Sequence, residues 1–81
     1  MRVRVRLGAG LSRLASAPLF TVDLADGATV EDLLGHLRET QPDLAPALRA
    51  ALPVVDGEHV RRDRRLADRQ EVALLVAVSG G

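Results

Sequence analysis

The apolar run at residues 72–78 limits the possible folds more than any other stretch of the chain. It contains only Val, Ala and Leu. A strand that is apolar on both faces belongs in the centre of a sheet, because a strand with one solvated face would alternate with polar residues. Ser79-Gly80-Gly81 follow the run directly. We therefore expect one domain over residues 1–78, whose last strand leads straight into a flexible tail at residues 79–81.

Two earlier segments, residues 2–7 and 19–24, alternate apolar and polar side chains and predict strands with one buried face. In the first of them, three arginines share the other face: Arg2, Arg4 and Arg6. Such a row is usually a solvated sheet face, and a partner-binding row is the less common alternative. Between the strands, residues 8–18 predict a glycine-containing loop, in which Leu11 and Leu14 pack onto the core.

The main helix is predicted to begin at Thr29 and to end at Thr40. Thr29 is a suitable N-cap, and Asp32 can complete a capping box. Apolar side chains recur at helical spacing on one face: Val30, Leu33, Leu34 and Leu37. Gly35 costs such a helix about 1 kcal/mol relative to Ala, so we expect it to permit a close approach to the sheet.

A second, short helix is expected next, with Asp43 as its cap. Its apolar side would contain Leu44, Leu48 and Leu52. Residues 53–55 read as a strand, placed at an edge because it opens on proline. The Asp56-Gly57 pair that follows is a strong hairpin signal. The basic run at residues 61–65 is interpreted as a solvated loop, with a docking patch for an acidic partner as the alternative.

The order of these elements predicts an α+β fold, with one mixed sheet of four or five strands and a main helix across one face. The last strand would lie parallel to the first, near the centre. Its second face would then lie beside the arginine row. We predict a partner-docking surface there, formed by Leu75, Ala73, Arg4 and Arg6.

Composition excludes several functional classes. The chain has no cysteine, so it lacks disulfides, thiolate metal sites and a cysteine nucleophile. Its 11 basic and 11 acidic residues balance, and a single Phe is its only aromatic residue, so nucleic-acid binding is not expected. His36 and His59 have no partners at catalytic or metal-ligand spacing, and the lone Gly8-x-Gly10 is not a phosphate loop. We expect no catalytic residue, no metal, no bound cofactor and no membrane span, in a cytoplasmic protein.

Nearly the whole chain resembles the β-grasp, or ubiquitin-like, fold, and more narrowly the sulfur carriers of the MoaD/ThiS type. The resemblance rests on residues 3–7, 27–34, 55–60, 66–68 and 71–75, and above all on the terminal Val78-Ser79-Gly80-Gly81. Two departures occur. Arg69 stands where the family often has glycine in the turn before the last strand. Val76-Ala77 stands where members that serve molybdopterin synthesis often have prolines.

The resemblance implies that the chain is a protein cosubstrate and not an enzyme. An E1-like adenylyltransferase would use ATP to adenylate the carboxylate of Gly81, and a sulfurtransferase or cysteine desulfurase would supply sulfur to form a thiocarboxylate. An acceptor such as a synthase large subunit would then receive the sulfur, with molybdopterin synthesis expected first. Gly80 and Ser79 would give the tail access to the partner's active site.

Three alternatives remain open at this point. The sulfur could serve thiamine, cysteine or a specialised natural product. The same glycine could instead join the chain to target proteins as a ubiquitin-like modifier. The domain could also be a plain interaction module without tail chemistry.

Overall fold

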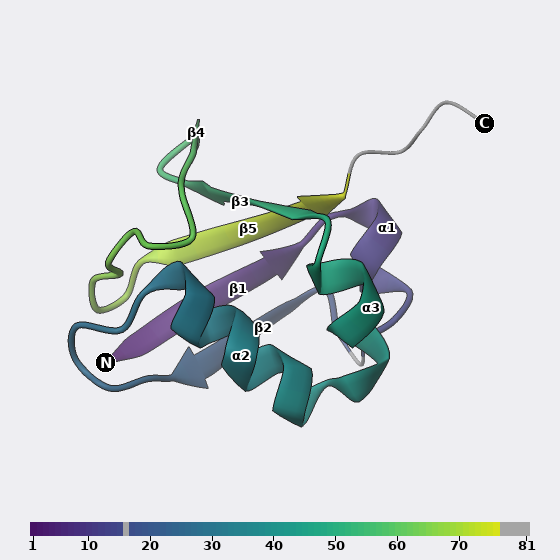
Figure 1. Ribbon diagram of the computed structural model, residues 1–81, viewed down its shortest axis with the longest axis horizontal. Coiled ribbons are helices and arrows are strands. Elements are labelled where there is room, and N and C mark those ends of the chain that lie inside the picture. Colours follow the sequence, from purple (N-terminus) through teal and green to yellow (C-terminus); the bar gives the residue numbers. More distant parts are fainter. Residues whose placement is uncertain (16, 77–81) are drawn as a thin grey trace.

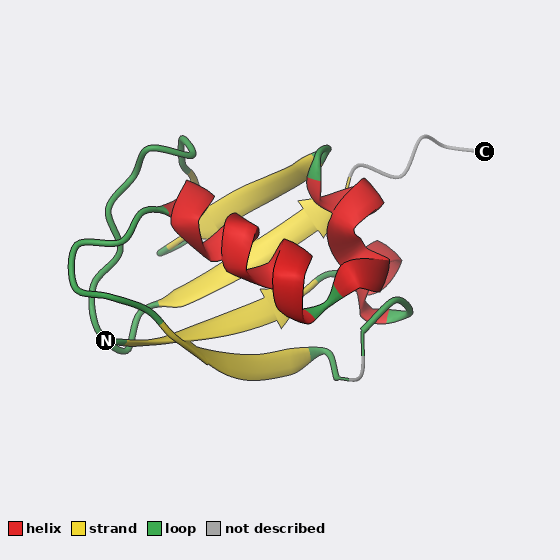
Figure 2. Cartoon of the chain, turned by 60° about the horizontal axis from the view of Figure 1, so that its bottom comes forward, coloured by secondary structure: helices red, strands yellow, loops and turns green. Residues whose placement is uncertain are grey.

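The computed structural model describes residues 1–15 and 17–76, which form a five-stranded sheet with helices packed on one face (Figures 1 and 2). The strands are β1 (Arg2–Leu7), β2 (Leu19–Asp23), β3 (Ala51–Val55), β4 (Glu58–His59) and β5 (Glu71–Val76). The helical elements are α1 (Ala9–Ser12), α2 (Val30–Thr40), the 3-10 turn η1 (Pro42–Leu44) and α3 (Ala45–Leu48). The strand order is β2-β1-β5-β3-β4, and the predicted α+β sheet is confirmed.

The apolar final strand lies in the middle of the sheet, as its sequence predicts. β5 pairs in parallel with β1 and antiparallel with β3. Val72 and Leu74 are completely buried on the helical side, whereas Leu75 on the other side is 42% exposed. The strand is described as far as Val76, so the predicted extension to Val78 lies outside the described residues.

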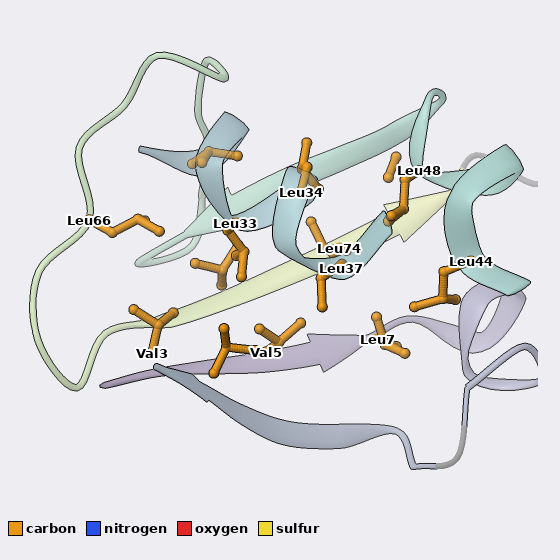
Figure 3. Packing of buried hydrophobic residues seen from close by; sticks show 14 of the residues in the cluster. Val3, Val5, Leu7, Leu33, Leu34, Leu37, Leu44, Leu48, Leu66 and Leu74 are labelled. Carbon is orange, nitrogen blue, oxygen red and sulfur yellow. The ribbon is translucent and has the colours of Figure 1, made fainter. Parts of the chain in front are cut away.

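Helix α2 supplies the opposing half of the core (Figure 3). Its four apolar side chains are all fully buried against the sheet: Val30, Leu33, Leu34 and Leu37. The predicted capping box is present, since the Asp32 N–H donates to Thr29 Oγ1 at 3.2 Å and the Thr29 N–H donates to Asp32 Oδ2 at 2.9 Å. No helix among the described residues is long and apolar enough to span a bilayer.

The backbone carbonyls of the basic run at residues 61–65 accept hydrogen bonds from the first turn of α2. The N–H of Val30 donates to the Arg64 carbonyl at 2.9 Å, and the N–H of Glu31 donates to the Arg62 carbonyl at 2.8 Å. These two amides belong to the first turn of α2 and have no partner within the helix. The run therefore caps α2 from outside, while Leu66, the next residue along, is buried in the core as an anchor.

The connection between β1 and β2 differs from the predicted loop. It contains the short helix α1, which buries Leu11 completely, as expected. The prediction for Leu14 is wrong, because this side chain is 41% exposed. The helix ends at Ser12, so Leu14 lies outside the helical turn that buries Leu11.

Three predictions around β3 are also wrong. Asp43 makes no capping hydrogen bond and lies within η1. Leu52 does not extend the apolar side of the short helix, since the chain becomes a strand at Ala51 and the two-residue period turns Leu52 outward. Residues 53–55 are not at an edge either, because β4 pairs with Val54 and Val55 and the Val60 N–H donates to the Pro53 carbonyl.

Gly35 does not mark a close contact with the sheet. A Cβ added at this position would meet only the Arg38 guanidinium within 4 Å, at an ordinary contact distance of 3.6 Å. The helix therefore has room for a side chain there, and the expected close approach is wrong.

The turn before β5 holds Arg69 in the left-handed region, at φ 66°. The strain is maintained by hydrogen bonds on both sides, since the Arg69 N–H donates to the Arg2 carbonyl at 2.6 Å and the Arg2 N–H donates to Asp68 Oδ1 at 2.7 Å. This is the position where the family often has glycine, and the expected strain of a non-glycine residue is confirmed.

We predict that Arg69→Gly raises the free energy of unfolding by about 0.5–1 kcal/mol, because glycine adopts positive φ without a Cβ clash. Urea denaturation measures the change. Arg13→Gly is the matched control, since Arg13 has an ordinary φ of −69°, and this variant should lose stability or keep it unchanged. A loss of stability in Arg69→Gly would contradict the prediction.

Asp68 links this turn to pH. The hydrogen bond from the Arg2 N–H, supported by the positive charge of Arg69, holds the pKa of the Asp68 carboxyl below its ordinary value. A carboxyl with a lowered pKa stabilises the fold above its unfolded pKa, and that contribution disappears as the pH falls through the folded pKa. Asp68→Asn cannot titrate, so it should lose less stability than the wild type between about pH 5 and about pH 2. Equal acid-induced losses in urea melts would contradict this.

Candidate functional site

The described part of the chain ends at the point where β5 delivers the tail. Strand pairing places Val76 opposite Ala51 at the start of β3. On the other side of β5, the N–H of Gly8 donates to the Leu74 carbonyl at 2.9 Å. The end of β5 is thus held between two neighbouring segments, and Figure 1 shows β5 between β1 and β3. The predicted tail residues Ser79, Gly80 and Gly81 lie outside the described residues.

The face of the sheet away from α2 carries an apolar strip formed by Leu52, Val54, Ala73 and Leu75. Leu52 and Leu75 are direct cross-strand neighbours and are 41% and 42% exposed. Val54 and Ala73 form the next pair on this face and are half-buried. The sequence predicted Leu75 and Ala73 for this surface. It missed Leu52 and Val54, because residues 51–55 are apolar throughout and carry no polar alternation that would assign each side chain to a face.

The predicted arginine row lies beside this strip. Arg6 is the register partner of Ala73, and Arg4 is the partner of Glu71. The Arg6 guanidinium contacts the Glu71 carboxylate, with Nε 3.3 Å from Oε2 and Nη2 3.4 Å from Oε1. Arg4 is exposed, and among residues 1–15 and 17–76 its guanidinium has no ion-pair partner. One continuous surface is therefore formed by Leu75, Ala73, Arg4 and Arg6. Within this surface, the Arg4 guanidinium is the positive charge without an ion-pair partner among the described residues.

The titratable side chains of the described residues do not gather into a metal-binding cluster. No group of three His, Cys, Asp or Glu side chains in it could hold a metal ion. His59 is exposed and His36 is half-buried, and they lie on β4 and α2, respectively. Among the described residues there is also no buried polar side-chain atom without a hydrogen-bond partner. The features that the described residues do show are the exposed apolar strip and the arginine row at the surface of β5 and β1.

Comparison with known proteins identifies the family. Residues 5–81 match the ThiS family. The chain belongs to the ThiS family. It is 32% identical over 83 residues to the molybdopterin synthase sulfur carrier subunit of Chlamydomonas reinhardtii, with all of both chains covered. The β-grasp assignment and the resemblance to MoaD/ThiS-type carriers are confirmed, and this ThiS-family chain is a sulfur carrier of that type rather than an enzyme.

Solved structures support the same fold for the ThiS-family chain. SAMP1 from Haloferax volcanii superposes with a TM-score of 0.90 at 27% identity, with all of both chains covered. The complex of subunits 1 and 2 of molybdopterin-converting factor from Helicobacter pylori contains a chain that superposes at a TM-score of 0.75, with 22% identity and full coverage of both. At that identity the second comparison shows the fold alone.

Proposed function

We propose that this ThiS-family chain carries sulfur as a thiocarboxylate on Gly81. The observation that carries the proposal is the position of β5. A central strand, paired on both sides, ends at Val76 beside an exposed apolar strip, and Ser79-Gly80-Gly81 follow shortly after it in the sequence. A partner that binds the strip would receive the tail in a defined direction.

The tail has the properties that activation of a carboxylate requires. A carboxylate is a poor electrophile, so it has to be activated in a site that excludes water. The four residues from Val78 to Gly81 can extend about 13–14 Å from the domain. Gly80 and Gly81 have no Cβ, so they fit a narrow channel in any backbone conformation.

The proposed reaction takes place at the carboxyl group of Gly81. A carboxylate oxygen first attacks the α-phosphorus of ATP in an E1-like adenylyltransferase, which forms the acyl-adenylate and releases pyrophosphate. The outer persulfide sulfur of a sulfurtransferase or cysteine desulfurase then attacks the carbonyl carbon and displaces AMP, and a thiol cleaves the resulting acyl disulfide, which leaves the thiocarboxylate and a new disulfide. The carrier supplies only the electrophile, and it binds no cofactor itself. Because the step consumes ATP, we place it in the cytoplasm.

We propose molybdopterin synthesis as the destination of the sulfur. The proposal rests on the 32% identity, over the full chain, to a molybdopterin synthase sulfur carrier subunit. The acceptor would then be the large subunit of a synthase, in keeping with the complex of two subunits in the Helicobacter pylori structure. The same tail chemistry could supply thiamine, cysteine or another metabolite.

A second function, protein conjugation, is favoured by the similarity to SAMP1 of Haloferax volcanii. SAMP1 is small archaeal modifier protein 1. The activated glycine would then form an isopeptide bond with a lysine of a target protein. All 11 basic residues of the protein are arginine, so it has no lysine. Copies of the modifier could therefore be joined to one another only through the amino group of Met1. Co-expression with an E1-like enzyme separates the functions, since tryptic digestion of a conjugate would leave residues 70–81 of the modifier attached to target lysines.

The docking role of the apolar strip gives a direct prediction. Leu75→Asp should weaken binding to the E1-like enzyme by tenfold or more, about 1.4 kcal/mol, because a carboxylate would have to be desolvated in the contact. Isothermal titration measures the affinity. The matched control is Leu14→Asp, since Leu14 is equally exposed at 41% but lies outside the strip. Equal affinities for Leu75→Asp and the wild type would remove the strip from the docking site.

A further inference from the structure

A cationic hollow lies at the outer side of β3, and neither the arginine row nor the tail accounts for it. It has a volume of about 520 Å³ and lies between the start of β3 and residues 59–62. We propose that this hollow binds an acidic peptide segment of a protein partner that also presents apolar side chains. The proposal does not depend on the chemistry of Gly81, since it concerns the folded domain alone.

Pro53 explains why the hollow exists. The Val60 N–H donates to the Pro53 carbonyl at 3.0 Å, but Pro53 has no N–H to return. The ladder between β3 and β4 therefore stops, and β4 pairs only with Val54 and Val55. The first part of β3 is left without a neighbouring strand on that side. Ala51 lies at this open edge, and an open edge can accept an extended segment of another chain.

The floor of the hollow is apolar. Leu52, Pro53 and Val60 line it, and Leu52 is 41% exposed. Leu52 also belongs to the apolar strip, so the hollow is continuous with the proposed docking face. A ligand that carried only charge would leave this floor exposed to water, which favours a peptide with apolar side chains over a free anion.

The rim of the hollow is basic, and none of the residues that line it is acidic. Arg49, Arg61 and Arg62 surround it, with His59 beside them. The Arg61 guanidinium is 88% exposed and lies 3.3 Å from Asp63. The Arg49 side chain has no ion pair within the described residues, so it is the charge most available to a ligand. The whole chain has zero net charge, and an acidic ligand would therefore be attracted to this rim rather than to the protein in general.

Arg62 builds the rim and does not act as a free charge. Its Nη2 donates to the carbonyls of Leu48 and Arg49 at 3.2 and 3.1 Å, and its Nη1 lies 3.4 Å from Glu31 Oε2. These contacts join the end of α3 to α2 and to the segment after β4. Arg62 thereby fixes the backbone at Arg49, one of the residues that line the hollow.

The composition of the site favours a peptide over nucleic acid. Base stacking requires aromatic platforms, and the lining contains no Phe, Tyr or Trp. The strand pairing also places Ala51 directly opposite Val76, at the root of the tail. A partner whose acidic segment occupied the hollow would therefore hold the domain within one strand's width of the departing tail.

The test uses the full chain and a fluorescein-labelled peptide of alternating glutamate and leucine. We expect saturable binding that weakens as salt rises from about 50 mM to about 500 mM. Amide NMR signals of Ala51, Val60 and Arg62 should shift most. The double variant Arg49→Glu/Arg61→Glu should bind at least about tenfold more weakly. If that variant fails to fold, Arg49→Gln/Arg61→Gln should show a smaller loss in the same direction.

The matched control is Arg64→Glu/Arg65→Glu, which changes the net charge equally at exposed residues that do not line the hollow. This control should bind the peptide like the wild type, and a peptide with serine in place of leucine should bind more weakly. The proposal is overturned by equal weakening in the control, by equal affinity for the serine peptide, or by amide shifts confined to Ala73 and Leu75. Absence of binding at about 1 mM peptide would overturn it as well.

Discussion

Leu74→Ala is expected to destabilise the domain by about 2–5 kcal/mol. Leu74 is fully buried at the centre of β5, under the helices, and its removal leaves a cavity in addition to the lost transfer free energy. A domain of 81 residues has a total stability of roughly 4–12 kcal/mol. The variant should therefore be partly unfolded at 37 °C, and urea denaturation followed by circular dichroism measures the loss.

The adjacent residue provides the control for this prediction. Leu75 has the same side chain, lies in the same strand and points to the opposite face, where it is 42% exposed. Leu75→Ala should change the free energy of unfolding by less than about 1 kcal/mol. Similar losses for the two variants would show that β5 does not separate a core face from a binding face.

Gly81→Ala is expected to abolish activation of the tail while leaving the fold intact. The added methyl group would lie next to the reacting carbonyl in a channel shaped for glycine. A misplacement of about 1 Å can cost roughly 100-fold in rate, so we predict at least that loss in ATP–pyrophosphate exchange with the E1-like partner. Thermal unfolding should match the wild type, because the residue lies beyond the strands and helices that form the core.

Gly35→Ala controls for the chemical change from glycine to alanine. Its new Cβ would contact only the Arg38 guanidinium, at 3.6 Å. We expect full exchange activity from this variant, together with a gain in stability of about 0.5–1 kcal/mol from better helix propensity. Normal exchange by Gly81→Ala would contradict the proposed role of the tail.

The sequence predicted those parts of the fold that depend on local pattern. Three such local patterns are confirmed: the apolar run in β5, the alternation in β1 and the capping box at Thr29. Leu52 was assigned wrongly because it continues the spacing of Leu44 and Leu48. The change from helical to strand period at Ala51 depends on pairing with the distant β5, which no local pattern reveals.

The candidate site was predicted in a similar, partial way. Leu75 and the arginine row followed from face alternation once β5 was placed beside β1. Val54 was missed because its face is decided by pairing with Ala73 of the distant β5. The cationic hollow was missed because it depends on how far β4 extends along β3. That length is limited by the missing N–H of Pro53 within a long-range pairing. Leu14 was misplaced because the sequence does not show where α1 ends.

The central claim concerns sulfur on the terminal glycine, and the intact mass of the carrier tests it most directly. The chain would be co-expressed with an E1-like adenylyltransferase and a sulfur donor, and then purified under mild, thiol-free conditions. We predict that the mass rises by the difference between one sulfur atom and one oxygen atom, and that Gly81→Ala shows no such rise. An unchanged mass in the wild type, or a mass increase confined to larger protein conjugates, would contradict the account.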